Sequence, residues 1–258
     1  MSHEDEYHVH MVTMLELIWG EGYMAPGGPG NVAKLLNGLE TEGKRVLDVG
    51  CGIGGPCFEV ARSYGSKVTG IDIEAPLITR ASEDAKKHGL EEQCDFRAVE
   101  PGPLPFADES FDIVLTSGAL TQTDPTRDLV EECFRVLAPG GHLTSYEWMR
   151  TDQEYSEDMY HWFEVEELTY ALNTLDEFDA LFCDAGFSDV VTTDATDWYL
   201  KESRREYELI KGDLYPRMVE SLGQADADHF VEDWRSMVVV IENGEMRQGY
   251  CRGRRPGR

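Results

Sequence analysis

Residues 48–55 read DVGCGIGG, a glycine-rich turn between a short apolar run and a helical pattern. Glycines at such a turn let the backbone bend sharply and present its N–H groups to a ligand at the N-terminus of the next helix. The spacing fits the dinucleotide pattern G-x-G-x-x-G at Gly50, Gly52 and Gly55, and it equally fits an acidic residue followed by alternate glycines. The turn therefore predicts a nucleotide-type cofactor without deciding which one.

A carboxylate, Asp72, stands at the end of the next apolar run. At the carboxyl edge of a parallel sheet such a side chain can hold both hydroxyls of a ribose. Metal chemistry is not predicted, because His8 and His10 stand two residues apart with no third ligand nearby. The six cysteines are scattered without a C-x-x-C pair, which favours reduced thiols and a cytoplasmic location.

Aromatic residues gather in and near an acidic part of the chain, residues 151–185. The rings are Trp148, Tyr155, Tyr160, Trp162 and Phe163. Aromatic faces attract methylated cations, and carboxylates around them attract cations at longer range. The alternative is that the rings form the core of a cap and the acids form its solvated face.

The order of the elements predicts a sheet edge that brings these groups together. Apolar strands are expected at Arg45–Val49, Lys67–Ile73, Cys94–Val99, Phe111–Thr116 and His142–Trp148, with helices at 57–63, 76–88 and 128–136. Strands that alternate with helices at this spacing predict a doubly wound, mostly parallel α/β sheet. Late strands at 190–193 and 248–252 would complete seven strands, with helices at 200–222 and 226–241 between them.

The chain of 258 residues is predicted to be one domain, 1–258, since this length suits one decorated core. Its expected parts are an N-terminal helical lid at 1–40, a cofactor-binding core at 45–150, a helical cap insertion at 151–185 and the completion of the sheet at 186–252. The lid is expected to contain helices at 7–18 and 30–39. The final RGRRPGR is expected to fray.

The net charge is strongly negative, with 23 Lys and Arg against 50 Asp and Glu, or −27. Such a field repels phosphate backbones and anionic lipid, so neither nucleic acid nor a membrane is a predicted partner. A hydrophobic share of 41% indicates a folded chain rather than an acidic disordered one. Residues 151–200 hold 14 acidic residues and no Lys or Arg. Adaptation to high salt and ordinary surface acidity both remain open explanations. No secretory signal or spanning segment is predicted.

Three further motifs follow the glycine turn in order: Glu100 after the third strand, FD at 111–112, and RVLAPGG at 135–141 before the fifth strand. With the glycine turn, this succession resembles class I S-adenosylmethionine-dependent methyltransferases over residues 45–148. The resemblance implies their Rossmann-like fold and S-adenosylmethionine as the cofactor.

The same resemblance implies individual cofactor contacts. The glycine loop would hold the methionine part, Asp72 the ribose, and Glu100 the adenine, although Pro101 beside it has no backbone N–H to offer. The positions implied within the core are Asp48, Gly50, Gly52, Asp72, Ile73, Val99, Glu100 and Ser117.

The N-terminal flank resembles a narrower group, the small phosphoethanolamine N-methyltransferases. Residues 17–28 read LIWGEGYMAPGG and are preceded by Tyr7; weaker similarity lies at 233–234 and 247–250. The resemblance implies that Tyr7 closes over cofactor and substrate and that Met24 and Ala25 contact the cofactor.

The catalytic motif of that group is altered after the fourth strand. The family's histidine position is Gln122 here, and its ammonium-binding aspartate is Gly118. Glutamine cannot remove a proton, so the change favours an acceptor without a proton to lose, or a proton that leaves through water or Tyr7.

The phosphate ligands of the group are also altered. Its two tyrosines match Tyr146 and Tyr170, but its arginine falls on Leu168 and its lysine falls near Ser236 or Met237. Burying a phosphate without Arg or Lys costs too much free energy. Phosphoethanolamine is therefore not the predicted acceptor.

These observations predict a methyltransferase that acts on a small molecule, an amine or a thioether, to give a methylated cation. The alternatives are methyl transfer to oxygen or carbon of a neutral metabolite, and a non-catalytic protein that binds S-adenosylmethionine. Tyr7 and Gln122 are the predicted catalytic positions. The predicted substrate contacts are Tyr7, Trp19, Gly118, Tyr146, Trp148 and Tyr170. The expected state is a monomer or homodimer.

Overall fold

One seven-stranded sheet, in the order β3-β2-β1-β4-β5-β7-β6, organises the computed structural model, which describes residues 9–166 and 170–257. β7 runs antiparallel to both of its neighbours, and the other pairs are parallel. The strands are β1 (Arg45–Val49), β2 (Lys67–Asp72), β3 (Cys94–Ala98), β4 (Phe111–Ser117), β5 (Leu137–Arg150), β6 (Ser188–Asp194) and β7 (Met246–Arg254). This confirms the predicted doubly wound, mostly parallel sheet.

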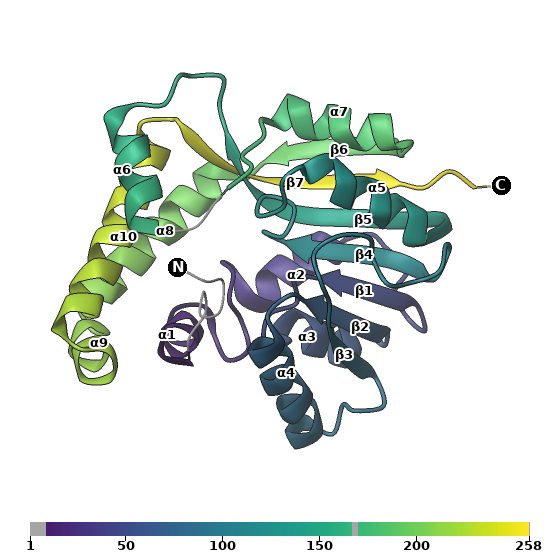
Figure 1. Ribbon diagram of the computed structural model, residues 1–258, viewed down its shortest axis with the longest axis horizontal. Coiled ribbons are helices and arrows are strands. Elements are labelled where there is room, and N and C mark those ends of the chain that lie inside the picture. The colour runs from purple at the N-terminus through teal and green to yellow at the C-terminus, as the bar shows by residue number, and fades with distance from the viewer. Residues whose placement is uncertain (1–8, 167–169, 258) are drawn as a thin grey trace.

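Helices cover both faces of the sheet and its carboxyl edge (Figure 1). The helices are α1 (Val9–Trp19), α2 (Gly28–Leu36), α3 (Gly55–Tyr64), α4 (Ala75–His88), α5 (Thr126–Val136), α6 (Glu157–Glu166), α7 (Leu175–Ala185), α8 (Thr196–Lys211), α9 (Tyr215–Leu222) and α10 (Gln224–Glu242). α5 and α7 pack on one face, and α2, α3 and α4 pack on the other.

Alternation along the strands produces these two cores. On β1, Val46 belongs to the core under α2 to α4, whereas Leu47 and Val49 belong to the core under α5 and α7. Successive side chains of a strand point to opposite faces, so a continuous apolar run is what a strand covered on both sides requires.

A third apolar layer lies beyond the carboxyl ends of the parallel strands. It joins α1, α6, α8, α9 and α10, and Figure 1 places these helices at the end of the sheet opposite the C-terminus. Because β7 runs antiparallel to β5, that end is where β1, β4 and β5 finish. The layer therefore covers the edge at which the predicted site residues emerge.

The two helices of the acidic segment 151–185 pack in different parts of the fold and do not form one cap. α6 belongs to the helical layer over the edge, since Trp162 is fully buried there. α7 instead packs on the sheet: Phe178 and Phe182 are buried in the core under α5. The residues over the edge come from α1 and α6, together with α8 to α10, which lie between β6 and β7 in the chain.

The sequence placed several boundaries incorrectly. The C-terminal residues through Arg255 do not fray, because β7 extends to Arg254 and Arg255 Nη1 donates to the carbonyls of Phe134, Arg135 and Leu137. The single helix expected at 200–222 is two helices separated at Gly212.

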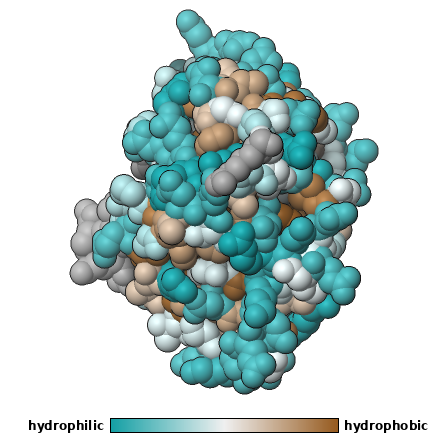
Figure 2. Space-filling model, turned by 90° about the vertical axis from the view of Figure 1, so that its right-hand side faces the viewer, coloured by the Kyte–Doolittle hydropathy of each residue, from teal (hydrophilic) through white to brown (hydrophobic). Residues whose placement is uncertain are grey.

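The surface at the opposite end of the sheet is mainly hydrophilic, with apolar residues in small separate groups (Figure 2). Within the described residues, no helix combines the length and apolar character needed to span a bilayer. Within the same residues, no group of three or more His, Cys, Asp or Glu side chains is arranged to hold a metal ion.

Candidate cofactor and acceptor site

The glycine turn after β1 adopts backbone conformations that other residues rarely adopt. Gly50 and Gly52 have φ of 72° and 53°. A Cβ added at Gly50 would lie 2.8 Å from the Ala119 Cβ, and one at Gly52 would lie 3.0 Å from the Met24 sulfur. Glycine is therefore required both by conformation and by the close approach of neighbouring segments.

Asp72 at the end of β2 fastens this turn. Its Oδ2 accepts from the Gly52 N–H at 2.9 Å, and its Oδ1 accepts from the Glu74 N–H at 3.0 Å. Burial raises the pKa of the Asp72 carboxyl, while these backbone donors favour its charged form. Each carboxylate oxygen can accept more than one hydrogen bond, so the group keeps capacity for the two hydroxyls of a ribose.

Side chains around Asp72 complete a surface suited to a nucleoside. Ile73 leaves 53% of its area exposed, which is unusual for a large apolar side chain and offers a face for a base. The Val99 N–H donates to the Asp72 carbonyl at 3.0 Å, which brings the end of β3 and the exposed Glu100 beside it. The glycine cradle, the ribose-binding carboxylate and this apolar face fit S-adenosylmethionine.

Asp48 lies behind the turn rather than on its open side. It is 2% exposed and its Oδ2 accepts from the Cys57 thiol at 3.1 Å. Burial raises the pKa of Asp48 to about 7. The structure therefore gives this predicted cofactor residue a place supporting the loop.

The N-terminal lid is held directly against the glycine turn. The Gly55 N–H donates to the Gly22 carbonyl at 2.9 Å, and the Gly22 N–H donates to Glu16 Oε1 at 2.8 Å. Met24 packs against both the turn and the helical layer, with Ala25 half-buried next to it. Tyr7 lies outside the described residues, so its catalytic assignment stays a prediction.

The loop after β4 brings Ser117, Gly118 and Gln122 to the same edge. The Gly118 N–H donates to the Tyr146 carbonyl at 2.9 Å, and the Gln122 N–H donates to the Gly118 carbonyl at 3.2 Å. Gln122 is exposed. Asn31 on α2 donates to the Ser117 hydroxyl at 3.4 Å.

Glu147 on β5 supports this loop and was not found from the sequence. It is fully buried, and its Oε2 accepts from the Thr121 N–H at 3.1 Å and the Thr121 hydroxyl at 2.9 Å. Burial raises its pKa to about 8. The available signal was a carboxylate facing the same core as Met149, where a strand position should be apolar.

Predicted substrate residues line the helical layer. Trp148, Trp162 and Tyr170 hold their rings within 6° of parallel, with centroids 5.4–6.0 Å apart. Tyr146 is buried, and its ring centroid lies 4.9 Å from that of Tyr250. Of the acidic segment's aromatic residues, Trp162 joins this stack, whereas Tyr160 is 58% exposed.

The same layer contains carboxylates. Glu206 is 1% exposed and accepts from the indole N–H of Trp19 at 2.8 Å and of Trp234 at 3.2 Å. Burial raises its pKa to about 7. The Asp233 carboxyl lies against Glu166, and burial together with this acidic neighbour raises the pKa of Asp233 well above its ordinary value.

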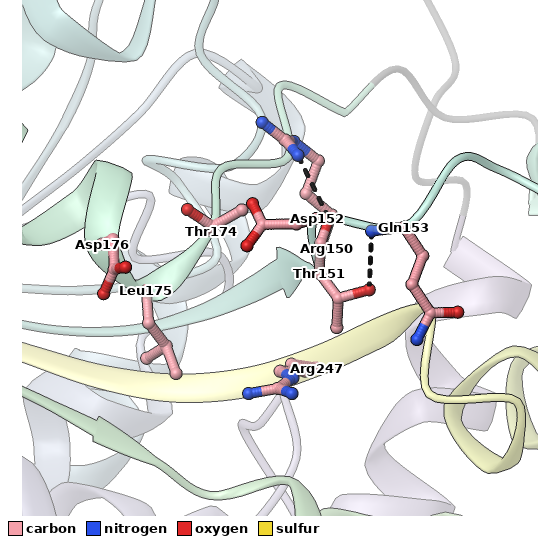
Figure 3. Close-up of a pocket in the computed structure, with 8 residues that line it drawn as sticks. All are labelled: Arg150, Thr151, Asp152, Gln153, Thr174, Leu175, Asp176 and Arg247. Atoms are coloured by element: carbon pink, nitrogen blue, oxygen red, sulfur yellow. Dashed lines mark hydrogen bonds between the residues drawn. The ribbon is translucent and has the colours of Figure 1, made fainter.

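A separate hollow of about 390 Å³ lies near the end of β5 and the start of α7 (Figure 3). It is lined by Arg150, Thr151, Asp152, Gln153, Thr174, Leu175, Asp176 and Arg247. Its arginines already have partners: Arg150 pairs with Glu177 at 2.5 Å and Arg247 pairs with Asp194 at 3.1 Å. This hollow contains none of the residues of the cofactor or acceptor site.

Comparisons with known proteins agree with this geometry. Residues 40–209 match the protein family described as a methyltransferase domain. Phosphoethanolamine N-methyltransferase of Triticum aestivum is 27% identical over 95% of this chain and 48% of its own length. 24-methylenesterol C-methyltransferase 2 of Oryza sativa subsp. japonica is 31% identical over 79% of this chain and 62% of its own length. The chain thus spans about half the length of the plant phosphoethanolamine relatives.

A solved structure shares the fold almost throughout. Phosphoethanolamine N-methyltransferase 2 of Haemonchus contortus, in complex with phosphomonomethylethanolamine and S-adenosylhomocysteine, superposes with a TM-score of 0.91 over 99% of this chain and 61% of that one. At 23% identity, this likeness establishes the architecture.

Proposed function

The chain belongs to the class I S-adenosylmethionine-dependent methyltransferases, and on that premise we propose that it methylates a small amine that carries no phosphate. The name of the phosphoethanolamine relatives supports an amine as the acceptor. The absence of a phosphate is our inference from the composition of the helical layer over the carboxyl edge.

One observation carries this proposal: carboxyls, indoles and a phenol meet in this layer through hydrogen bonds. Glu206 accepts from the indole N–H of Trp19 and of Trp234, and the Tyr170 hydroxyl donates to Glu166. A phosphate requires cationic partners when it is removed from water. Carboxylates and aromatic faces instead favour a neutral or cationic ligand.

The chain's residues would divide the work between binding and orientation. S-adenosylmethionine supplies an electrophilic methyl group on a sulfonium. Asp72 and the glycine turn would hold its ribose and methionine parts, and Met24 would separate them from the aromatic layer. These contacts fix the positions of both reactants, which is a large part of catalysis in a direct displacement.

The proton that the amine loses must go to water or to a residue of the lid. The attacking nitrogen must be neutral, because an ammonium has no lone pair to donate. The side-chain carbonyl of Gln122 can accept a hydrogen bond from an amine N–H and orient it, but it cannot remove the proton. A proton lost after transfer would leave through water or through Tyr7, the predicted lid residue.

The experiment is an acceptor panel with purified protein, following S-adenosylhomocysteine formation and product mass. The panel contains glycine, dimethylglycine, ethanolamine, phosphoethanolamine, a thioether and an alcohol. We expect methylation of ethanolamine or another phosphate-free amine at a higher kcat/KM than phosphoethanolamine. Faster turnover of phosphoethanolamine, or transfer to the alcohol alone, would refute the proposal. The Asp72→Ala variant serves as the control for cofactor-dependent turnover.

The second candidate is methyl transfer to carbon, which the likeness to the Oryza sterol C-methyltransferase favours. A sterol needs a long apolar cavity, whereas the aromatic stack of Trp148, Trp162 and Tyr170 occupies the layer beside the edge. The same panel, extended by a sterol, separates the two candidates through the mass and polarity of the product.

A further inference from the structure

Of the five buried side-chain atoms without a hydrogen-bond partner among the described residues, two lie in the helical layer over the acceptor site. Asp233 Oδ1 on α10 and the indole nitrogen of Trp162 on α6 are buried and have no hydrogen-bond partner among the described residues. Trp162 as a whole is 0% exposed. A buried polar atom left without a partner costs about 1–3 kcal/mol, so two within one layer call for an explanation.

A neighbouring hydroxyl in the layer, that of Tyr199, is also poorly satisfied. The Tyr199 hydroxyl, also fully buried, makes its hydrogen bond to the Met237 thioether, at 3.3 Å, and sulfur is a weak acceptor. Tyr170 donates its hydroxyl to Glu166 Oε1 at 2.5 Å. In this layer the Asp233 oxygen therefore lacks a donor, whereas the Trp162 N–H and the Tyr199 O–H lack a strong acceptor.

The Asp233 carboxyl lies among acidic groups, one of which, Glu232, is itself paired with Arg235 and His161. The charged groups that act on the Asp233 carboxyl are Glu166 and Glu232, both acidic, and Asp233 and Glu166 are hydrogen-bonded to each other. Two carboxyls that share one proton carry a single negative charge between them. One bound cation would neutralise that charge and take up the free oxygen of Asp233.

We propose that Asp233 and Glu166, joined through the Tyr170 hydroxyl to the aromatic stack of Trp148, Trp162 and Tyr170, bind an ammonium group of the acceptor. The rings supply cation–π attraction, and the carboxyl pair supplies acceptors for the ammonium hydrogens. This inference rests on the proposed function for its location next to the reacting amine. The inference adds a binding site and a substrate class to the proposed function.

If the carboxyl pair binds one ammonium group, the acceptor must carry a second basic group to be methylated. A nitrogen held by the carboxyl pair stays protonated and cannot attack a methyl group. The nitrogen that receives the methyl group must be a second one, neutral and nearer the glycine turn. The substrate class is therefore a diamine, in which one end is recognised as a cation and the other end is methylated.

The first test is binding, measured by calorimetry on the full chain saturated with S-adenosylhomocysteine. The probes are butylamine, a monocation at neutral pH, and butanol, a neutral molecule of the same length. We expect butylamine to bind more tightly than butanol. In Asp233→Asn, we expect the affinity for butylamine to fall at least tenfold while that for butanol is unchanged. The matched control is Asp226→Asn, an exposed position on the same helix.

Two results would overturn the site: equal affinity for butylamine and butanol, including no detectable binding of either, or unchanged butylamine binding in Asp233→Asn. S-adenosylhomocysteine affinity and melting temperature of each variant show whether the fold is retained. If Asp233→Asn does not fold, Glu166→Gln takes its place with the same expectation.

A turnover arm separates this inference from the proposed function. Putrescine, a diamine, is expected to show a KM at least tenfold below that of butylamine, with Asp233→Asn raising the KM for putrescine and leaving kcat within twofold. Equal KM values for the two amines would refute the diamine class while leaving amine methylation intact. If no amine is methylated, the proposed function fails, and the binding arm still decides whether the ammonium site exists.

Discussion

Replacing Glu147 by glutamine is expected to stabilise the protein at neutral and alkaline pH. This glutamate is fully buried beneath the loop after β4, and its pKa is raised from 4.5 to about 8 because burial disfavours the charged form. Glutamine has nearly the same shape and keeps an oxygen that can accept from the Thr121 N–H. The substitution therefore removes the ionisation and preserves the main hydrogen bond.

The sign and size follow from proton linkage. The folded state holds the Glu147 proton more tightly than the unfolded state, so the associated stability is complete below pH 4.5 and is lost as the pH rises to about 8. One pH unit corresponds to about 1.4 kcal/mol, which gives a loss of about 3 kcal/mol by pH 7 and an upper limit of about 5 kcal/mol above pH 8. The Glu147→Gln side chain does not ionise, so the variant does not lose this stability as the pH rises.

The assay is urea unfolding of wild type and Glu147→Gln at pH 5, 7 and 9, compared as a difference at each pH. The difference cancels the contributions of other buried acids such as Asp48 and Glu206. We expect the variant to gain stability relative to wild type as the pH rises. Glu91→Gln, an exposed position, should show no such trend. A difference that is constant with pH would refute the assignment of a raised pKa to Glu147.

Three other substitutions test the cofactor site, the lid contact and the C-terminal strand. Asp72→Asn should weaken S-adenosylhomocysteine binding roughly 10–100-fold in calorimetry, since it removes a charged acceptor worth about 1.5–3 kcal/mol; unchanged affinity would remove Asp72 from the site. Gly55→Ala places a Cβ 2.2 Å from the Gly22 oxygen, so unfolding should show a loss of about 1–3 kcal/mol, and an unaltered protein would contradict this lid contact. Arg255→Ala should cost about 1–3 kcal/mol by leaving carbonyls at the end of α5 unpaired, whereas a frayed tail would make it neutral.

The fold was predictable because its signals are local. Each strand of the core is a short apolar run, and each ends at a turn whose residues have a conformational reason to be there, as at Gly50 and Gly52. The failures lie where a tertiary contact decides the outcome. α7 is as acidic as its neighbours, but Phe178 and Phe182 on one side commit it to the sheet.

The placement of the candidate site residues was predictable only where backbone geometry dictates the residue. Asp72 and the glycine turn follow from the order of the elements, and the structure joins them by a hydrogen bond. Glu147 and Asp233 were missed, because a carboxylate in a strand or a helix reads as a surface residue until its burial is known. Only the packing of distant segments reveals that their carboxyls are enclosed.

The acidic residues of this protein consequently fall into two groups by location, and only those in the layer over the carboxyl edge are relevant to the choice of substrate. The 14 acids of residues 151–200 are mostly at the surface, and several serve the fold, as Glu177 does in the capping box of α7. Of the three carboxyls described above for the layer over the edge, Glu166, Glu206 and Asp233, only Glu166 belongs to that segment. Glu206 and Asp233 come from α8 and α10. A preference for a cationic acceptor therefore depends on these three carboxyls, since solvent and salt would screen the much larger surface charge around them.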